Sequence, residues 1–303
     1  MSGAKFTAIG IDVGGTKIAA GVVSFPGGTV GPRKILPTEG NSAAALESVY
    51  QTARELADKS RQAGVEVGGI GLGLCEIVTR DGTIASRASL QWSETEIRDR
   101  LSTIVPVVIE ADVRAAARAE ALFGAGKGLS CFLYVSIGTG ISCSLVIEGE
   151  PFVGARGAAG TMASGPMPTF GSKAPGVSLE QIASGPALRE RYAAAGGNAR
   201  STKEVLAAAD QGDKKAIDIV YSGAAALGAS IGWLVNVLDP QLVILGGGLG
   251  LSEGLFRETL VGAARQHVWW HGHRDVRIVS AQTGTEAGII GAAATAWRQL
   301  ARD

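Results

Sequence analysis

A short segment near the N-terminus combines residues that could bind phosphate and magnesium. Asp12 ends a strand-like segment, residues 6–12, and the run that follows is Gly14-Gly15-Thr16-Lys17. Glycines let the backbone approach a phosphate, while the hydroxyl, ammonium and carboxylate groups offer partners for phosphate oxygens and Mg²⁺. A hairpin turn without any ligand would also favour Gly-Gly, so this motif alone leaves both interpretations open.

Two further glycine turns follow strand-like segments. The first is Gly138-Thr139-Gly140, between the apolar segments 131–137 and 141–147. It repeats the strand, glycine turn and strand of the N-terminus, so the two turns could clamp one triphosphate from both sides. The second is Gly246-Gly247-Gly248, which follows the strand-like segment 242–245. It permits close approach to adenine or ribose, although a glycine run is also an ordinary strand exit.

A third strand-like segment, residues 107–109, leads into Glu110-Ala111-Asp112 and then into an alanine-rich helix that reaches about Phe123. A carboxylate at such a strand end suits a general base that accepts a hydroxyl proton. The same residue would also serve as the N-cap of the helix. The residues alone do not decide between these two roles of Asp112.

The surrounding pattern predicts an α/β protein with two domains and a cleft between them. With 303 residues, 46% hydrophobic residues and 44 glycines, the chain exceeds the usual size of one core. Helical spacing marks residues 42–64, 202–238 and 286–300, and strands are predicted at 67–74 and 276–280. We expect a small domain of residues 1–117 plus a C-terminal helix at about 289–303, and a large domain of residues 118–288.

Charge and cysteine usage exclude several classes of partner. The chain has 28 basic and 28 acidic residues without long runs of either sign, which argues against nucleic-acid or membrane partners. Three cysteines without Cys-x-x-Cys spacing favour reduced thiols over disulfides or zinc. No apolar stretch approaches the roughly 20 residues that span a bilayer, so we expect a cytoplasmic protein.

The ordered set of motifs resembles the ROK family of sugar kinases and repressors. Besides the glycine turns, the set includes Glu-x-Asp at residues 110–112, Ala121-Leu122-Phe123-Gly124-Ala125-Gly126, Leu179-Glu180-Gln181-Ile182-Ala183-Ser184-Gly185 and the run from Glu286 to Ala293. The resemblance covers nearly the whole chain. It implies an actin-like, hexokinase-type fold of two ribonuclease-H-like domains around a central ATP and sugar cleft.

The resemblance also implies the roles of the motifs. ATP and Mg²⁺ would be held by Asp12 through Lys17 and by Gly138 through Gly140, with Asp12 contacting Mg²⁺ through water. Asp112 would be the catalytic base, and Glu180 matches a glutamate that contacts the sugar. Because phosphoryl transfer depends mainly on positioning and charge neutralisation, the base would add about 10²–10⁴-fold.

Several sugar contacts of the family are replaced. Ala111 stands where family kinases carry Asn, and Cys75-Glu76 replaces Pro-Gly. The motif Gly-Glu-x-Gly-His becomes Gly160-Thr161-Met162-Ala163-Ser164, so Gly160, Thr161 and Ser164 would line the sugar site without that Glu and His. Residues 165–178 contain no Cys or His, so the zinc site of the family has no ligands in this segment.

These replacements indicate either a decayed site or one refitted for a different sugar, and the retained Asp12, Lys17, Asp112 and Glu180 favour refitting. A partly buried Glu76 needs a cationic or hydrogen-bonding partner, which an ammonium group on the substrate would provide, although Glu76 could instead face solvent.

The chain is also similar to kanosamine 6-kinases of ansamycin-antibiotic pathways. That similarity implies phosphorylation of the C6 hydroxyl of 3-amino-3-deoxy-D-glucose; the alternatives are glucose, another hexose, or an inactive sugar sensor.

The remaining candidates concern partners. The spacing of His267 and His271 could place both on one helical face as metal ligands, but Trp269-Trp270 between them favours surface or interface packing. The family makes a homodimer plausible. Family repressors carry an N-terminal helix-turn-helix, and a first strand that begins six residues after the start leaves no room for one, which argues against a repressor.

Overall fold

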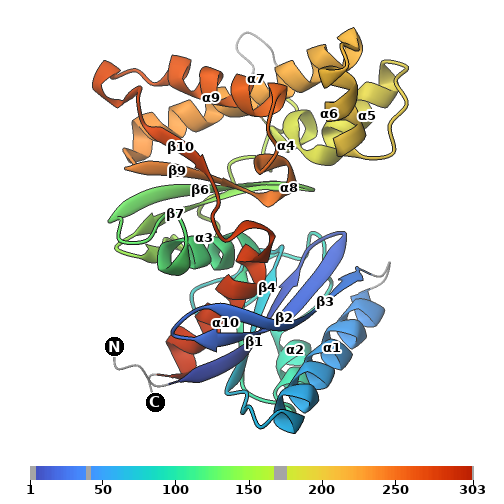
Figure 1. The fold of residues 1–303 in the computed structure, drawn as a ribbon, viewed down its shortest axis with the longest axis vertical. Helices are drawn as coiled ribbons and strands as arrows, with labels where there is room; N and C mark the ends of the chain where they lie inside the picture. Colours follow the sequence, from blue (N-terminus) through green and yellow to red (C-terminus); the bar gives the residue numbers. More distant parts are fainter. Residues whose placement is uncertain (1–4, 39–41, 167–175, 302–303) are drawn as a thin grey trace. The chain divides into compact units, whose positions relative to one another are not determined.

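The computed structural model describes residues 5–38, 42–166 and 176–301, and it divides into two compact units. Unit 1 contains residues 1–129, 144–159 and 285–303, and unit 2 contains residues 130–143 and 160–284. Each unit is centred on a mixed sheet (Figure 1). The predicted α/β organisation in two parts is therefore confirmed.

The sheet of unit 1 has the strand order β3-β2-β1-β4-β5. Its strands are β1 (Phe6–Val13), β2 (Lys17–Phe25), β3 (Thr29–Pro37), β4 (Gly69–Leu74) and β5 (Val107–Ala111). β1 and β2 form the predicted antiparallel hairpin, whereas β1, β4 and β5 run parallel. The carboxyl ends of these three parallel strands therefore meet at one edge of the sheet.

Helices cover both faces of this sheet. They are α1 (Ser42–Gln62), α2 (Glu94–Leu101), α3 (Asp112–Phe123) and α10 (Ala287–Leu300). α1 and α2 bury their apolar sides in one core, while α10 packs on the opposite face. That second contact requires glycines, because a side chain on Gly10 or Gly71 would come within 2 Å of a carbonyl oxygen of α10. The helix axis can thus lie unusually close to the sheet.

The second sheet has the strand order β10-β9-β6-β7-β8. Its strands are β6 (Cys131–Ile137), β7 (Ile141–Ile147), β8 (Glu150–Pro151), β9 (Leu242–Gly246) and β10 (Arg277–Ser280). The helices are α4 (Glu180–Ala183), α5 (Gly185–Ala194), α6 (Thr202–Asp210), α7 (Lys214–Leu238), α8 (Gly247–Gly250) and α9 (Leu255–His267), with short 3₁₀ turns at His271–His273 and Gly284–Glu286. Residues of β6, β9, α7 and α9 share one large apolar core.

The predicted boundary between residues 117 and 118 differs from the observed division. It falls inside α3, a continuous helix whose residues belong to unit 1 together with the chain as far as residue 129. Residues 144–159 also join unit 1, because the chain leaves unit 2 within β7. The alanine-rich composition of α3 gave no sign of where the unit ends.

Among the described residues, one helix is long and apolar enough to cross a membrane, contrary to the expectation that no stretch approaches that length. This helix is α7. Its buried residues recur every three or four positions and line the core of unit 2. Side chains at Gly228 and Gly232 would each come within 2.3 Å of a carbonyl oxygen of α9. Such close packing on one face is typical of a core helix in a globular protein.

Candidate active site

The two predicted functional carboxylates of unit 1 lie at the same edge of the sheet, on strand ends that one further strand separates. Asp12 of β1 pairs in register with Gly73 of β4, and β4 pairs on its other side with β5, which ends one residue before Asp112. Cys75 follows β4 directly, between the two. The carboxyl ends of parallel strands are where open α/β sheets bind ligands. The register therefore gathers side chains that the sequence identified separately.

The Asp12 carboxylate lies against the start of α10. A side chain on Gly288 would come within 2.4 Å of Oδ2 of Asp12, so this position of the helix leaves room only for glycine. Burial raises the pKa of Asp12 to about 6, and the charge of Lys17 acts in the opposite direction. A cation bound beside this half-buried carboxylate would stabilise its ionised form, as the helix N-terminus does, and would offset the loss of hydration.

Asp112, the first residue of α3, is the candidate base. Burial first, and then the charge of Asp12, raise its pKa to about 7; Glu76 adds to this, while the N–H of Val113 and the charge of Arg114 lower it. Oδ1 of Asp112 accepts the N–H of Val113 at 2.6 Å. The preceding residue occupies the N-cap position, and no side-chain cap bond is present. Asp112 is therefore available to accept a proton near neutral pH, and its interpretation as the helix cap is not supported.

Glu76 is buried, and the protein itself holds its charge. The carboxylate accepts hydrogen bonds from the Ser86 hydroxyl and from the N–H groups of Ala88 (3.0 Å), Ser89 (2.6 Å) and Leu90 (2.8 Å). Burial would raise its pKa, but these donors outweigh it and hold the pKa of Glu76 below its usual value. A carboxylate has about four acceptor positions. The required hydrogen-bonding partners thus come from the protein's own loop rather than from a substrate ammonium, and the solvent-facing alternative is wrong.

The same loop brings a residue to the site that the sequence did not single out. Ser89 hydrogen-bonds Cys75, whose thiol pKa is raised to about 12 by burial and by the charge of Asp112. Ala111, buried at the end of β5, offers only a methyl group where the family resemblance predicts an amide. No pattern near Ser89 could have revealed this placement, because it depends on how Glu76 folds residues 86–90.

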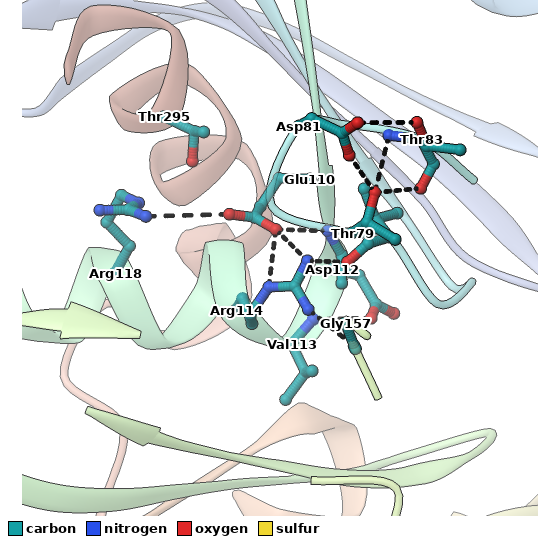
Figure 2. Close-up of polar contacts among 12 residues, drawn as sticks. Thr79, Asp81, Thr83, Glu110, Asp112, Val113, Arg114, Arg118, Gly157 and Thr295 are labelled. Atoms are coloured by element: carbon teal, nitrogen blue, oxygen red, sulfur yellow. Dashed lines mark hydrogen bonds and ion pairs between the residues drawn. The ribbon is translucent and has the colours of Figure 1, made fainter. Parts of the chain in front are cut away.

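Sequence reasoning also missed a buried ion pair beneath the site. Glu110 and Arg114 lie four residues apart, and Nε of Arg114 donates to Oε1 of Glu110 at 2.7 Å (Figure 2). Arg118, one turn later, approaches the other carboxylate oxygen of Glu110 to 3.8 Å. A Glu-x-x-x-Arg spacing was the available signal, but on a helix it usually marks an exposed pair.

The glycine turn of unit 1 presents an open surface. The N–H of Gly14 donates to the carbonyl of Lys17 at 3.0 Å, and Thr38 closes the turn by donating its hydroxyl to the carbonyl of Gly14 at 2.7 Å. Thr16 and Lys17 are exposed. No heavy atom lies within 4 Å of the place where a side chain at Gly15 would begin, and its backbone is not left-handed. The fold therefore does not explain glycine at this position.

In unit 2, Glu180 lies beside the glycine turn that follows β6. Its Oε2 accepts the N–H of Ile141 at 2.8 Å and would lie 2.9 Å from a side chain at Gly140. The N–H of Gly138 donates to the carbonyl of Gly140 at 2.9 Å, and Thr139 is exposed at the tip. The predicted sugar ligand and one predicted phosphate turn are thus direct neighbours.

The three glycine positions after β9 differ in whether the fold requires glycine there. A side chain at Gly246 would overlap the Tyr134 hydroxyl, and Gly247 has a left-handed φ of 77° and lies against the carbonyl of Ile137. Gly248, in contrast, has no heavy atom within 4 Å of an added side chain. Packing thus accounts for two of the three, and Gly248 is the open position of the run.

Of the predicted loop around residues 161–178, the structure describes part. Gly160 has a φ of 90° and packs against the carbonyl of Cys143, while Thr161 and Ser164 are exposed. Residues 167–175, which include most of the segment where the zinc ligands were predicted to be missing, lie outside the described residues. Within the described ranges, no three His, Cys, Asp or Glu side chains form a possible metal site.

The histidines do not share a helical face. His267 ends α9, and its Nδ1 lies 2.8 Å from the carbonyl oxygen of Ala263, whereas His271 belongs to the following 3₁₀ turn. Trp269 and Trp270 are 83% and 54% exposed, so the prediction of surface packing fits this segment better than metal binding.

Comparison with known proteins decides the family. A model described as the ROK family matches residues 8–299 of the chain. The chain belongs to the ROK family. The glucokinase of Streptomyces coelicolor is 30% identical over 313 residues, covering 94% of this chain and 96% of that protein. The putative xylose repressor of Caldicellulosiruptor is 25% identical over 310 residues, covering 94% of this chain and 77% of the repressor.

Solved ROK structures confirm the actin-like, two-domain kinase fold. The glucokinase of Streptomyces griseus in complex with glucose and AMPPNP superposes with a TM-score of 0.83 and 26% identity, covering 96% of this chain and 99% of that one. The ROK hexokinase of Thermus thermophilus gives a TM-score of 0.80 with 31% identity, covering 98% and 100%. This ROK protein is therefore glucokinase-like over nearly its whole length.

Proposed function

We propose that this ROK protein is an ATP-dependent sugar kinase that phosphorylates the C6 hydroxyl of a hexose, with Asp112 as general base. The observation that carries the proposal is the half-buried carboxylate of Asp112, which lies at the strand ends close enough to Asp12 for that charge to help raise its pKa to about 7. The glucokinase and hexokinase relatives support the reaction class.

In this reaction Asp112 accepts the proton of the sugar hydroxyl as the oxygen attacks the γ-phosphorus of ATP. The bond from that phosphorus to the bridging oxygen breaks, and ADP leaves with the electron pair. Asp112 would then release its proton to solvent. Its raised pKa suits this role, because a base is most effective when its pKa lies near the working pH.

Asp12 would contact Mg²⁺ through water. Its oxygen chemistry fits that ion, which prefers oxygen ligands and keeps several of its waters. When bound with ATP, Mg²⁺ neutralises phosphate charge. The residues of this chain would orient the nucleotide: Gly14 through Lys17 and Gly138 through Gly140 at the phosphates, and Gly246 through Gly248 near the adenosine. The open positions at Gly15 and Gly248 support such roles.

The amino sugar kanosamine is the finer prediction, with glucose as the alternative. Glu76 no longer supports a direct bond to the amine, because its acceptor positions are filled. An ammonium-bearing sugar is supported instead by the negative charge around Asp112, since the charges of Asp12 and Glu76 both raise the pKa of Asp112. Glucose is supported by the glucokinase relatives.

The test is the release of ADP with Mg-ATP, coupled to NADH oxidation, with kcat/KM compared for kanosamine, glucose and glucosamine. Turnover of any hexose well above the Asp112→Asn background supports the kinase, and the ranking decides the sugar. If no sugar is turned over while glucose or kanosamine still binds in calorimetry, the sensor alternative replaces the kinase.

A homodimer and a cytoplasmic location stay predictions. Exposed aromatic side chains of unit 2 supply a possible contact surface: Tyr221, Trp233, Trp269 and Trp270. Light scattering on the purified protein measures the oligomeric state, and a monomer at micromolar concentration would contradict the dimer.

A further inference from the structure

Arg114 is almost completely buried, with 1% of its surface exposed, and it contacts three parts of unit 1. Besides Glu110, its guanidinium donates from one terminal nitrogen to the carbonyl of Gly157 at 3.0 Å and from the other to the carbonyl of Val78 at 2.5 Å. Figure 2 shows this head group between Glu110 and Gly157. One side chain thus joins α3 to two loops.

Stability alone does not explain this arrangement. Burying a charged pair loses much hydration energy, and an apolar pair of similar size is often at least as stable. A guanidinium, however, offers five N–H groups in a fixed planar arrangement that an apolar side chain cannot replace. The useful property of Arg114 is therefore the geometry it imposes on its partners.

The two carbonyl groups belong to segments in direct contact. Gly157 has a φ of 80°, and a side chain there would come within 2.3 Å of the carbonyl oxygen of Val78 and 3.0 Å of Cα of Thr79. Close approach thus requires glycine, and Arg114 ties both carbonyls to the helix that begins with Asp112.

One of these segments continues the Glu76 loop. It folds back on itself, because the N–H of Thr79 donates to the carbonyl of Thr83 at 2.9 Å and Ala85 donates to Ile77 at 2.8 Å. At one end of the loop, the Glu76 carboxylate accepts the N–H groups of residues 88–90. At the other end, Arg114 ties the carbonyl of Val78 to α3. Cys75 and Ser89, at the two ends of this loop, hydrogen-bond each other, and Cys75 lies close enough to Asp112 for that charge to raise its thiol pKa.

We propose that Arg114 is a positioning residue for the sugar: by clamping the carbonyls of Val78 and Gly157 to α3, it fixes the loop of residues 76–90 against the candidate base. This inference rests on the proposed kinase function. It assigns Arg114 no contact with the sugar or the nucleotide.

The experiment replaces the whole pair, with Arg114→Met combined with Glu110→Gln, so that no buried charge is left without its partner. Arg118→Met is the matched control, because Arg118 lies one turn along the same helix, is similarly buried and contacts neither loop carbonyl. We expect sugar kcat/KM to fall about ten- to a hundredfold in the double variant, as small misplacements do, with KM for ATP changed less than about twofold. Arg118→Met should retain sugar kcat/KM near the wild-type value.

Hydrogen exchange tests the clamp independently of catalysis. In the double variant, amides of residues 77–86 and 154–159 should exchange faster, while those of α7 should not change. Unchanged exchange in both segments would overturn the clamp, and faster exchange with unchanged sugar kinetics would overturn the positioning role. An equal rise in KM for sugar and ATP would also count against it. A wild type without sugar kinase activity would refute the proposed function but leave the exchange test valid.

Discussion

Glu76 and Asp112 follow adjacent parallel strands of one sheet, yet they are in opposite electrostatic states. Glu76 accepts four hydrogen bonds from its own loop, and its pKa lies below the usual value. Asp112 accepts a bond from Val113, and its pKa is raised to about 7. Burial alone does not decide the charge of a carboxylate: hydrogen-bond donors lower the pKa of Glu76, whereas the charge of Asp12 raises that of Asp112 further.

The difference separates a structural role from a chemical one. The fold uses every acceptor of Glu76, so little of its chemistry is left for a ligand. It leaves Asp112 with unused acceptor capacity and a pKa near neutrality, which is the state that a general base needs. Gly15 extends the comparison, because the fold uses neither its flexibility nor its small size. Each of the following variants tests this difference between residues that the fold uses and residues that it leaves for chemistry.

The largest effect is expected for Asp112→Asn, which removes the base and keeps the shape. Sugar turnover should fall about 10²–10⁴-fold, because proton transfer is lost. Nucleotide affinity, measured by calorimetry with a non-hydrolysable ATP analogue, should change less than about threefold. In the wild type, kcat/KM should decline as the pH falls through about 7, where Asp112 becomes protonated. Full activity of the variant would contradict the role of the base.

Glu76→Gln should give the next largest effect, because an amide nitrogen replaces an acceptor oxygen that faces N–H donors. We expect a loss of about 2 kcal/mol or more in the free energy of unfolding, measured by urea denaturation. The kcat/KM values for glucose and kanosamine should fall together, by roughly ten- to a hundredfold. A loss confined to kanosamine would instead make Glu76 a direct ligand of the amine.

A smaller effect is expected for Gly15→Ala. The fold accommodates this side chain, so stability should change by less than about 1 kcal/mol. If the turn receives phosphates, KM for ATP should rise about tenfold with KM for sugar unchanged. Gly247→Ala is the contrasting variant, since its left-handed backbone and its contact with Ile137 predict a large loss of stability. Unchanged ATP kinetics in Gly15→Ala would argue against phosphate binding at this turn.

The smallest effect concerns stability and pH. Asp12 and Asp112 have folded-state pKa values of about 6 and 7, above the unfolded value of 3.8. Their contribution to stability is therefore complete below about pH 4 and is lost as the pH rises through 6 and 7. Asp112→Asn should raise Tm at pH 8 by roughly 2–4 °C, and the gain should be smaller at pH 5 and disappear below about pH 4. Differential scanning fluorimetry at both pH values measures this, and an equal gain at both would refute the assigned pKa.

The sequence predicted most of the elements that carry the site. Strands β6 and β7 begin and end where apolar runs indicated, and α3 ends at Phe123 as expected. Strand β3 was not predicted, because it is an edge strand with charged and proline residues and hence weak apolar alternation. Helix α9, likewise, lacks strong start signals: its N-cap is a glycine without a side-chain cap bond.

The sequence predicted the site less completely than the fold. Asp12 and Asp112 could be named because each lies at the end of an apolar strand, and the register then brought them together. The partners of Glu76 and Arg114 could not be named, because most are backbone groups distant in sequence and carry no residue-type signal. Hydrogen bonding by the main chain is what single-sequence reasoning could not see.

The glycine-lined contact between α10 and the first sheet has a consequence for biosynthesis. β1 and β4 leave the ribosome early, but the helix that covers their glycines is translated only after all of unit 2. The apolar face of the first sheet that α10 covers therefore stays exposed until α10 is made, whereas the residues of the unit 2 core have all been made by then. The order in which the two units are completed is thus the reverse of the order in which they begin. A ribosome stalled before residue 287 would hold a nascent chain with an exposed apolar surface that chaperones bind.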